Sequence, residues 1–597
     1  MILAVICRAR NRLLAAHPTA EAIIVGRRQK NSIKTRMTIM TRCDSNRFRS
    51  AFYLGLTLIF FLSGCGDDNN DNKPQPPVES EPVKVSGTPT VGGLRFVDAF
   101  AWAPDSSRIA YIAEQDSDSE ELYSSTPEGA ANNVKVSGPI TSGGDVKSFL
   151  WSPDLAVTNL IAYLADSQTI NVNDLYTSTP AGNGNQNVSG SLEPGGRVTA
   201  FYDWASTTTG SNPLPLVFMA AKDNPSTVEL YVTADNGQTT TKLSGSMVSG
   251  GNVTGFAISP NGRFVVYRAD QETKGMFELY TVPIGGGTVI NVSQLFGTIL
   301  EVKDFAWAPN ISPNRSQIAF RAFNAFTGAT GGNIELFTNF SSGGDPVTVS
   351  NSLGVGVDVD TFQWSPTGQF IAYTANTIVG SSRQFRLFAA LPGSNNRAFP
   401  LSNIPAATNV YTIGKFQWSP NGSIVAFLAD INILGINELL VVEPNTISTP
   451  VAISGTLADG GEVVEFAWAP NNTRIAYRAD QFEDEKFDLI TVVPDVNSLN
   501  PRPDPRLVSG NIIGDVAEFD WSPDSSRIAY TADGDTLGVF ELYTNVPFGT
   551  SNFKVSGALI SGGEVTSFAW APDSSLIAYQ ASQDEANIEE LYVTQPF

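Results

Sequence analysis

The stretch FAWAPDSSRIAYIAE, residues 100–114, decides the fold because it recurs along the whole chain. Close copies are FDWSPDSSRIAYTAD at 519–533 and FAWAPDSSLIAYQAS at 568–582. Ten units follow one another at spacings of 49 to 57 residues, and Ile258 takes the place of tryptophan in one of them. The other nine units hold Trp102, Trp151, Trp204, Trp307, Trp364, Trp418, Trp468, Trp521 and Trp570. Self-similarity at such a period indicates a repeat architecture.

Each unit contains four short runs of alternating, aromatic or β-branched residues bounded by Gly, Pro, Asp and Ser. Such runs are the sequence signal of strands, here named a to d, and Pro-Asp-Ser-Ser between a and b suits a tight turn. In the last unit we expect strands a, b and c at 564–571, 575–581 and 590–594, with d in the position of 553–556 in the unit before. Four-stranded antiparallel sheets repeated radially form a β-propeller.

The two ends of the repeat region predict a closed ring. The last run, 590–594, is of type c, whereas the first, VKVSG at 83–87, is of type d and copies KVSG at 135–138. The first strand is therefore expected to complete the last blade. We predict an all-β fold, a propeller of ten four-stranded blades in one ring, because no linker divides the units. Two five-bladed rings in tandem are the alternative, since propellers usually have four to eight blades.

The repeated phrase resembles the WD-repeat-like units of the TolB type, which also build the propellers of prolyl oligopeptidases and dipeptidyl peptidases. The resemblance covers residues 83–597, and it implies a propeller without implying one activity, because this repeat serves scaffolds, receptors and enzyme caps. The Gly-x-Ser-x-Gly nucleophile motif of the peptidases and its histidine are absent from the repeats.

The N-terminal region has the features of an export signal. Three arginines precede the apolar run 51–61, which is followed by Leu-Ser-Gly-Cys at 62–65. From Ala51 to Gly64 is too short to span a bilayer, for which about 20 residues are needed. The sequence at 62–65 resembles the bacterial lipobox, which implies cleavage before Cys65 and lipidation of its sulfur. Gly66, where some bacteria use Asp to retain lipoproteins in the inner membrane, favours the outer membrane.

These features predict four segments. Met37 or Met40 would begin a signal peptide of ordinary length, so we expect residues 1–36 to be a non-native extension and 37–64 the signal peptide. Residues 65–82 are rich in Asn, Asp and Pro and are expected to form a lipidated, disordered tether. The β-propeller is expected to occupy residues 83–597.

Composition restricts the chemistry. The only histidine is His17 and the only cysteines are Cys7, Cys43 and Cys65, so the repeats can form neither a His-dependent triad nor a zinc site with His or Cys ligands. Of the 37 Lys+Arg and 59 Asp+Glu, 26 and 57 lie beyond residue 64. Such an acidic body disfavours nucleic acids and anionic membrane surfaces and favours basic or cation-bridged partners. We expect a monomer that meets the membrane through its lipid anchor only.

Acidic residues recur at two places in the unit. One is the start of strand a, and the other directly follows strand b. Because both connections fall at the same face of an antiparallel blade, we expect these carboxylates to gather around one mouth of the ring. The candidate acidic binding face comprises Asp145, Glu462, Asp515 and Glu564 before strand a, and Asp166, Asp270, Asp430, Asp480 and Asp533 after strand b. Converging carboxylates could hold a structural Ca²⁺, although Asp and Glu also serve as ordinary turn residues.

Two functions remain open at this point. The first is a non-catalytic, lipid-anchored scaffold that binds a protein or surface ligand; it has no catalytic residues and no cofactor beyond a structural calcium. The second is a carbohydrate-active enzyme that uses paired carboxylates in the central channel. Recurrent acids favour the scaffold, because a catalytic pair should stand out as unique. The recurrent tryptophans and the Tyr of Ile-Ala-Tyr are expected to pack between and within blades.

Overall fold

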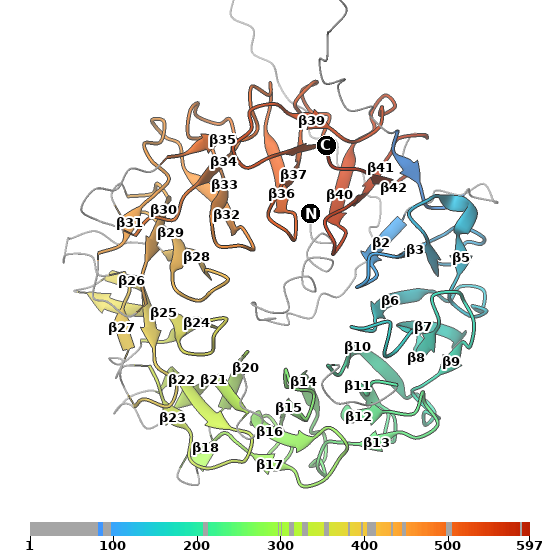
Figure 1. Cartoon of the computed structure of the whole chain (residues 1–597). Helices are drawn as coiled ribbons and strands as arrows, with labels where there is room; N and C mark the ends of the chain where they lie inside the picture. The colour runs from blue at the N-terminus through green and yellow to red at the C-terminus, as the bar shows by residue number, and fades with distance from the viewer. Residues whose placement is uncertain are drawn as a thin grey trace, which may run out of the picture. The chain divides into compact units, whose positions relative to one another are not determined.

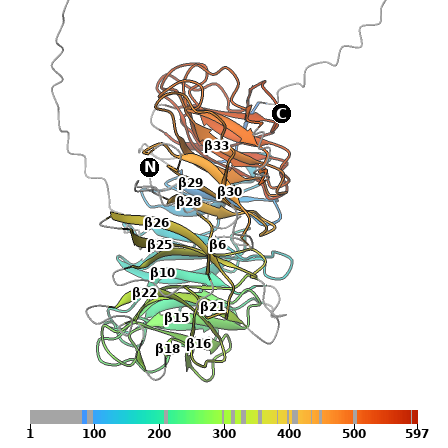
Figure 2. The ribbon, with the colours of Figure 1, turned by 90° about the vertical axis from the view of Figure 1, so that its left-hand side faces the viewer.

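The computed structural model describes residues 81–87, 97–206, 213–295, 298–299, 301–309, 316–324, 332–350, 357–379, 382–395, 398–402, 413–431, 434–444, 449–496, 504–585 and 588–597. Ten four-stranded antiparallel sheets form a ring (Figure 1). The prediction of one ten-bladed ring is confirmed, and the alternative of two five-bladed rings is wrong. Figure 2 shows the same blades from the side of the ring.

Strand a of each blade lies innermost (Figure 1). In blades 1 to 10 it is β2 (Val97–Trp102), β6 (Val146–Trp151), β10 (Arg197–Trp204), β14 (Val253–Ile258), β20 (Glu301–Trp307), β24 (Val359–Trp364), β28 (Ile413–Trp418), β32 (Val463–Trp468), β36 (Val516–Trp521) and β40 (Val565–Trp570). Strand b is β3 (Ile109–Ala113), β7 (Ile161–Thr169), β11 (Leu216–Ala221), β15 (Phe264–Ala269), β21 (Gln317–Asn324), β25 (Ile371–Val379), β29 (Val425–Ala429), β33 (Ile475–Ala479), β37 (Ile528–Ala532) and β41 (Ile577–Ala581).

Strands c and d complete each sheet toward the outside. Strand c is β4 (Glu121–Ser125), β8 (Val172–Ser178), β12 (Glu229–Thr233), β16 (Glu278–Pro283), β22 (Asn333–Phe340), β26 (Ser382–Ala390), β30 (Glu438–Val442), β34 (Asp488–Val492), β38 (Glu541–Asn545) and β42 (Glu590–Thr594). Strand d is β5 (Val134–Lys135), β9 (Gln186–Asn187), β13 (Thr241–Lys242), β17 (Ile290–Asn291), β23 (Val347–Thr348), β27 (Ala398–Pro400), β31 (Val451–Ala452), β35 (Arg506–Leu507), β39 (Phe553–Lys554) and β1 (Val83–Lys84). A short hairpin, β18 (Gln294–Leu295) and β19 (Thr298–Ile299), and a 3₁₀ turn, η1 (Ala130–Asn132), lie outside the blades.

The repeated tryptophans join neighbouring blades, as predicted. Trp151 Nε1 donates a hydrogen bond of 3.1 Å to the carbonyl oxygen of Ala101, which precedes Trp102 in the blade before. Eight of the nine indoles make the corresponding bond, at 3.0 to 3.4 Å. The exception is Trp468, whose buried Nε1 has no partner in the described part of the chain. Each blade core therefore extends into the next one.

In eight of the ten blades an aromatic residue of strand b stacks on one of strand c. Tyr111 and Tyr123, for example, lie with their ring centroids 5.6 Å apart, and both side chains are almost fully buried. The prediction that the Tyr of Ile-Ala-Tyr belongs to the core is confirmed, because all six are almost fully buried: Tyr111, Tyr163, Tyr373, Tyr477, Tyr530 and Tyr579. Buried aromatic pairs of this kind contribute about 0.5–1.5 kcal/mol beyond the area they bury.

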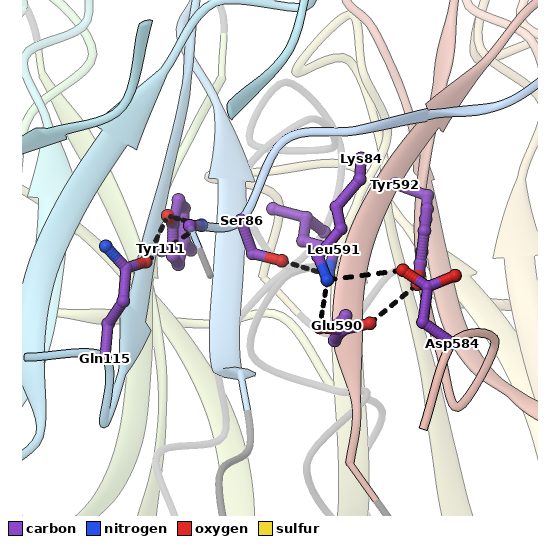
Figure 3. Close-up of polar contacts among 9 residues, drawn as sticks. Lys84, Ser86, Tyr111, Gln115, Asp584, Glu590, Leu591 and Tyr592 are labelled. Carbon is purple, nitrogen blue, oxygen red and sulfur yellow. Dashed lines mark hydrogen bonds and ion pairs between the residues drawn. The ribbon is translucent and has the colours of Figure 1, made fainter. Parts of the chain in front are cut away.

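The first strand closes the ring, as the sequence predicts. β1 pairs with β42 in antiparallel register, with Val83 opposite Val593. Lys84 forms an ion pair with Glu590, and Ser86 Oγ accepts a hydrogen bond of 3.1 Å from Leu591 N–H (Figure 3). Beyond this strand, Gly87 N–H donates to Tyr111 Oη in blade 1 at 3.2 Å. Blade 10 is thus completed by the other end of the chain.

Candidate functional site

The two predicted sets of acids do lie on one face of the ring. This face carries the d-to-a and b-to-c connections, and we name it the acid face. Within blade 8 the two connections are in direct contact, since Ala458 N–H donates to the carbonyl oxygen of Gln481 at 2.9 Å. Blade 2 repeats the contact between Thr141 and Ser167, also at 2.9 Å.

The Asp residues at the end of strand b are buried acceptors; Asp166 lies within β7, and the other four directly follow their strands. Asp166 is 2% exposed, and its two carboxylate oxygens accept the N–H groups of Asp145 at 2.6 Å and Asn171 at 2.8 Å. One carboxylate therefore fixes both connections of the blade. Burial raises the pKa of Asp166. The two N–H donors and the positive charge of Lys147 lower it by more than burial raises it, so the pKa lies below its ordinary value.

The other members of this set occupy the same place. Asp270 accepts the N–H groups of Asn252 and Gly275 at 2.6 and 2.8 Å. Asp480 accepts the N–H groups of Glu462 and Glu485, and Asp533 those of Asp515 and Gly538. Asp430 accepts Gly435 N–H at 3.0 Å. All four are less than 8% exposed, so these carboxylates shape the loops from within.

The acids before strand a lie nearer the surface and contact the previous blade. Asp145 Oδ1 accepts Glu120 N–H of blade 1 at 3.3 Å, and Asp515 Oδ1 accepts Phe487 N–H of blade 8 at 2.9 Å. Glu462 Oε2 accepts from the Asn437 amide at 2.9 Å. Glu564 is exposed. The structure thus brings six of the predicted acids together in three pairs, in blades 2, 8 and 9, and their role in binding stays a prediction.

The turn built by each buried Asp displays the residue four positions further on. In three blades this residue is a large apolar side chain that points away from the core, exposed by 48% at Ile170, 61% at Leu434 and 68% at Leu537. The next residue donates its N–H to the Asp and has a positive φ, of 64° at Asn171, 83° at Gly435 and 76° at Gly538. No sequence signal marks these display positions, because they carry different residue types: Lys274 and Asp484 occupy them in blades 4 and 8.

A second displayed position lies at the inner rim of the acid face. In every blade the pairing of strands a and b shifts near the start of strand a, between Val97 and Ala99 in blade 1 for example. A bulge turns a side chain out of the alternating pattern, and the bulged residues Asp98, Lys147 and Lys303 are exposed. No sequence signal distinguishes a bulged strand from a regular one here.

Another buried acid was also missed, the Glu that begins strand c. In blade 3 Glu229 is 5% exposed, pairs with Lys242 of strand d at 2.6 Å and accepts the Tyr231 hydroxyl at 3.1 Å. Glu590 does the same with Lys84 and Tyr592 (Figure 3). The sequence holds a signal for this contact, because Glu-Leu-Tyr and Lys-Val-Ser recur together. That the Glu of the first pairs with the Lys of the second follows only from the register of strands c and d.

One group of carboxylates does not follow the repeat. The residue before strand c is acidic only in blades 1 and 10, as Glu120 and Glu589. Burial raises the pKa of Glu120 to about 7, the charges of Asp98 and Asp145 add to the rise, and Lys147 opposes it. Burial raises the pKa of Glu589 as well. These groups therefore share one electrostatic environment across blades 10, 1 and 2.

The described residues contain no group of three or more Asp, Glu, His or Cys side chains arranged to hold a metal ion, so the Ca²⁺ considered from the sequence has no such cluster there. No helix in this part of the chain is long and apolar enough to cross a bilayer. Cys65, the predicted signal peptide and the segment 1–36 lie outside the described residues, as does the tether up to residue 80.

No protein-family model matches this chain, and no curated protein matches it in sequence. Among solved structures, an oligogalacturonate lyase in complex with manganese is 13% identical over 72% of this chain and 94% of its own, with a TM-score of 0.30. A prolyl endopeptidase is 12% identical over 64% of this chain and 54% of its own, with a TM-score of 0.32. The tricorn protease is 14% identical over 84% and 47%, with a TM-score of 0.26. These likenesses carry no argument about activity.

Proposed function

We propose that this chain is a non-catalytic, lipid-anchored propeller of the TolB-like, WD-repeat-like kind, which binds a protein or surface ligand with its acid face. It works outside the cytoplasm at the bacterial cell envelope, held through Cys65 at the outer membrane. The ligand is basic or reaches the carboxylates through a bridging cation, and it is not a nucleic acid. The ring itself is a monomer.

The observation that supports this proposal most is that the repeated carboxylates bind backbone N–H groups of their own loops. Asp166 and its equivalents bind backbone N–H groups and are buried, so they are engaged in shaping loops and are poorly placed to exchange protons with a substrate. The loops they shape hold displayed residues that differ from blade to blade, such as Leu434, Lys274 and Asp484. A fixed framework with variable displayed residues suits recognition.

The proposal is tested by recovering ligands from envelope fractions with the full chain, with and without a chelator. The acid-face variant Glu193→Gln/Glu483→Gln/Glu564→Gln should lose a ligand that wild type retains. The matched variant Asp105→Asn/Glu128→Gln/Asp573→Asn, on the face with the a-to-b and c-to-d connections, should keep it. Equal recovery by both variants, or no ligand with wild type, would contradict a binding role for the acid face.

A second candidate, a carbohydrate-active enzyme, has one specific observation in its favour. Glu120 is a non-repeating carboxyl with a pKa raised to about 7, and it lies within the electrostatic reach of Asp98. Glycosidases pair a carboxylic acid of raised pKa with a second carboxylate. Release of reducing ends from a panel of polysaccharides tests it. Activity that Glu120→Gln abolishes would favour the enzyme, and no release from any substrate would favour the scaffold.

A further inference from the structure

The exposed apolar side chains of the acid face are concentrated in blades 7 to 9. Leu434 is 61% exposed, Phe482 55%, Ile513 57% and Leu537 68%. They come from the b-to-c loops of three consecutive blades and from the d-to-a connection between blades 8 and 9. None belongs to a core cluster. Large apolar side chains exposed together on a soluble protein indicate an interaction surface.

Contacts between loops hold these residues on a common support. Ile513 N–H donates to the carbonyl oxygen of Gly534 at 3.3 Å, which ties its connection to the loop of Leu537. Ala458 contacts Gln481 in the same way, next to Phe482. The positive φ of Gly435 and Gly538 is fixed by Asp430 and Asp533. The apolar side chains are therefore presented by ordered turns.

The same loops are strongly acidic. The b-to-c loops of blades 7 to 9 and the d-to-a connections beside them span 430–437, 455–462, 480–487, 510–515, 533–540 and 557–564. They contain eleven Asp or Glu residues and a single basic residue, Lys486. Asp459, Glu483, Asp484, Glu485, Asp535 and Glu564 are exposed among them. Charge and exposed apolar area thus coincide in one third of the ring.

We infer that this sector, Leu434, Phe482, Ile513 and Leu537 with the exposed acids around them, docks a protein segment whose basic side chains alternate with large apolar ones. The inference rests on the proposed function and deepens it by naming the sector and the partner chemistry. Eleven carboxylates repel phosphate and anionic lipid headgroups. A basic segment complements them, and its apolar side chains cover the displayed leucines and phenylalanine.

Five forms of the full chain, in nonionic detergent, test the inference. The apolar variant is Leu434→Ser/Phe482→Ser/Leu537→Ser, and its control is Leu391→Ser/Val493→Ser/Val546→Ser, three exposed apolar residues of the opposite face. The charge variant is Glu483→Gln/Asp484→Asn/Glu485→Gln. Its control, Asp118→Asn/Asp223→Asn/Glu272→Gln, removes exposed acids of the same face in blades 1 to 4. Unchanged thermal unfolding of each variant shows that the fold is intact.

The probe is an immobilised synthetic peptide of alternating Lys and Leu, compared with a Lys–Ser and a Glu–Leu peptide of equal length. We expect wild type to bind the Lys–Leu peptide at 0.15 M salt and each of the other two at least tenfold more weakly. The apolar and the charge variant should each lose at least tenfold in affinity, and both controls should stay within twofold of wild type.

Four results would overturn the inference. Equal affinity of wild type and the apolar variant places binding elsewhere, as does an equal loss in all four variants. A higher affinity for anionic vesicles than for the Lys–Leu peptide would assign the sector to a membrane. If wild type forms an oligomer and only the apolar variant is monomeric, the sector binds a second copy of this chain. In each case a ligand still recovered from the envelope through the acid face leaves the proposed function standing, so the two failures are distinguishable.

Discussion

Ser86 Oγ accepts a hydrogen bond of 3.1 Å from Leu591 N–H, although the two residues lie 505 positions apart in the chain. The same bond joins Ser556 to Leu542 inside blade 9, also at 3.1 Å. The terminal blade is therefore built like an internal one. We expect Ser86→Ala and Ser556→Ala to lower the free energy of unfolding equally, by about 1–2 kcal/mol, because each leaves a buried N–H unpaired. Urea titration measures both, and a neutral Ser86→Ala beside a costly Ser556→Ala would contradict closure.

The indole bonds between blades make a second prediction. Trp102→Phe removes a donor to Ala569, whereas Trp468→Phe removes an indole N–H that has no partner in the described structure. The two substitutions lose similar apolar area, so the difference between their losses of stability measures the contribution of the indole hydrogen bond. Trp102→Phe should cost about 1 kcal/mol more. Thermal unfolding of the two variants provides the comparison, and equal costs would mean that the indole bond contributes nothing.

The buried turn carboxylates make a third. Asp166→Ala leaves two N–H groups without their acceptor and should cost about 2–4 kcal/mol. Asp166→Asn should cost less than half of that, because Asn376 fills the same place in blade 6 and accepts Asp358 N–H at 2.7 Å. Since the pKa of Asp166 is lowered, its contribution is present above the ordinary Asp pKa of about 3.9 and lost as the pH falls below it. Urea midpoints at pH 7 and pH 3 should therefore differ more for wild type than for Asp166→Ala.

Glu120 predicts the opposite pH dependence. Its pKa is raised to about 7 in the fold, so its favourable contribution is present below the ordinary Glu pKa of about 4.3 and lost as the pH rises through 7. Glu120→Gln should stabilise the ring at pH 8 by about 1 kcal/mol, after allowance for solvent screening, and change little at pH 4. Unfolding midpoints across this range check it. If the difference in stability between Glu120→Gln and wild type is the same at pH 4 and pH 8, the pKa of Glu120 is not raised in the fold.

Cys65→Ser tests the anchor independently of the ring. The lipobox resemblance leads us to expect that wild type incorporates labelled fatty acid and sediments with membranes, and that the variant does neither. Circular dichroism of the variant should be unchanged, since Cys65 lies outside the blades. Membrane association that survives the substitution would contradict lipid anchoring.

The blades and their closure could be predicted from the sequence because nearly identical phrases impose the same strands ten times. Because 83–87 is a run of type d and 590–594 one of type c, the pairing of the first strand with the last could also be predicted. The acid face was predicted for the same reason, because the connections alternate between two faces. The apolar side chains displayed on it could not be predicted, because Leu434 and Leu537 are held by a turn whose positive φ depends on a hydrogen bond to a buried Asp. Bulged residues such as Asp98 depend on a register shift that composition does not reveal.

The most direct test of the closed ring is a disulfide between the two ends of the repeat region. Val83 lies opposite Val593 in the antiparallel pairing of β1 and β42, and paired positions of neighbouring strands lie within disulfide range. Val83→Cys/Val593→Cys should form an intramolecular bridge under mild oxidation, detected by mass spectrometry of the unreduced protein. Free thiols at positions 83 and 593, or bridges between molecules, would show that the first strand does not complete the tenth blade.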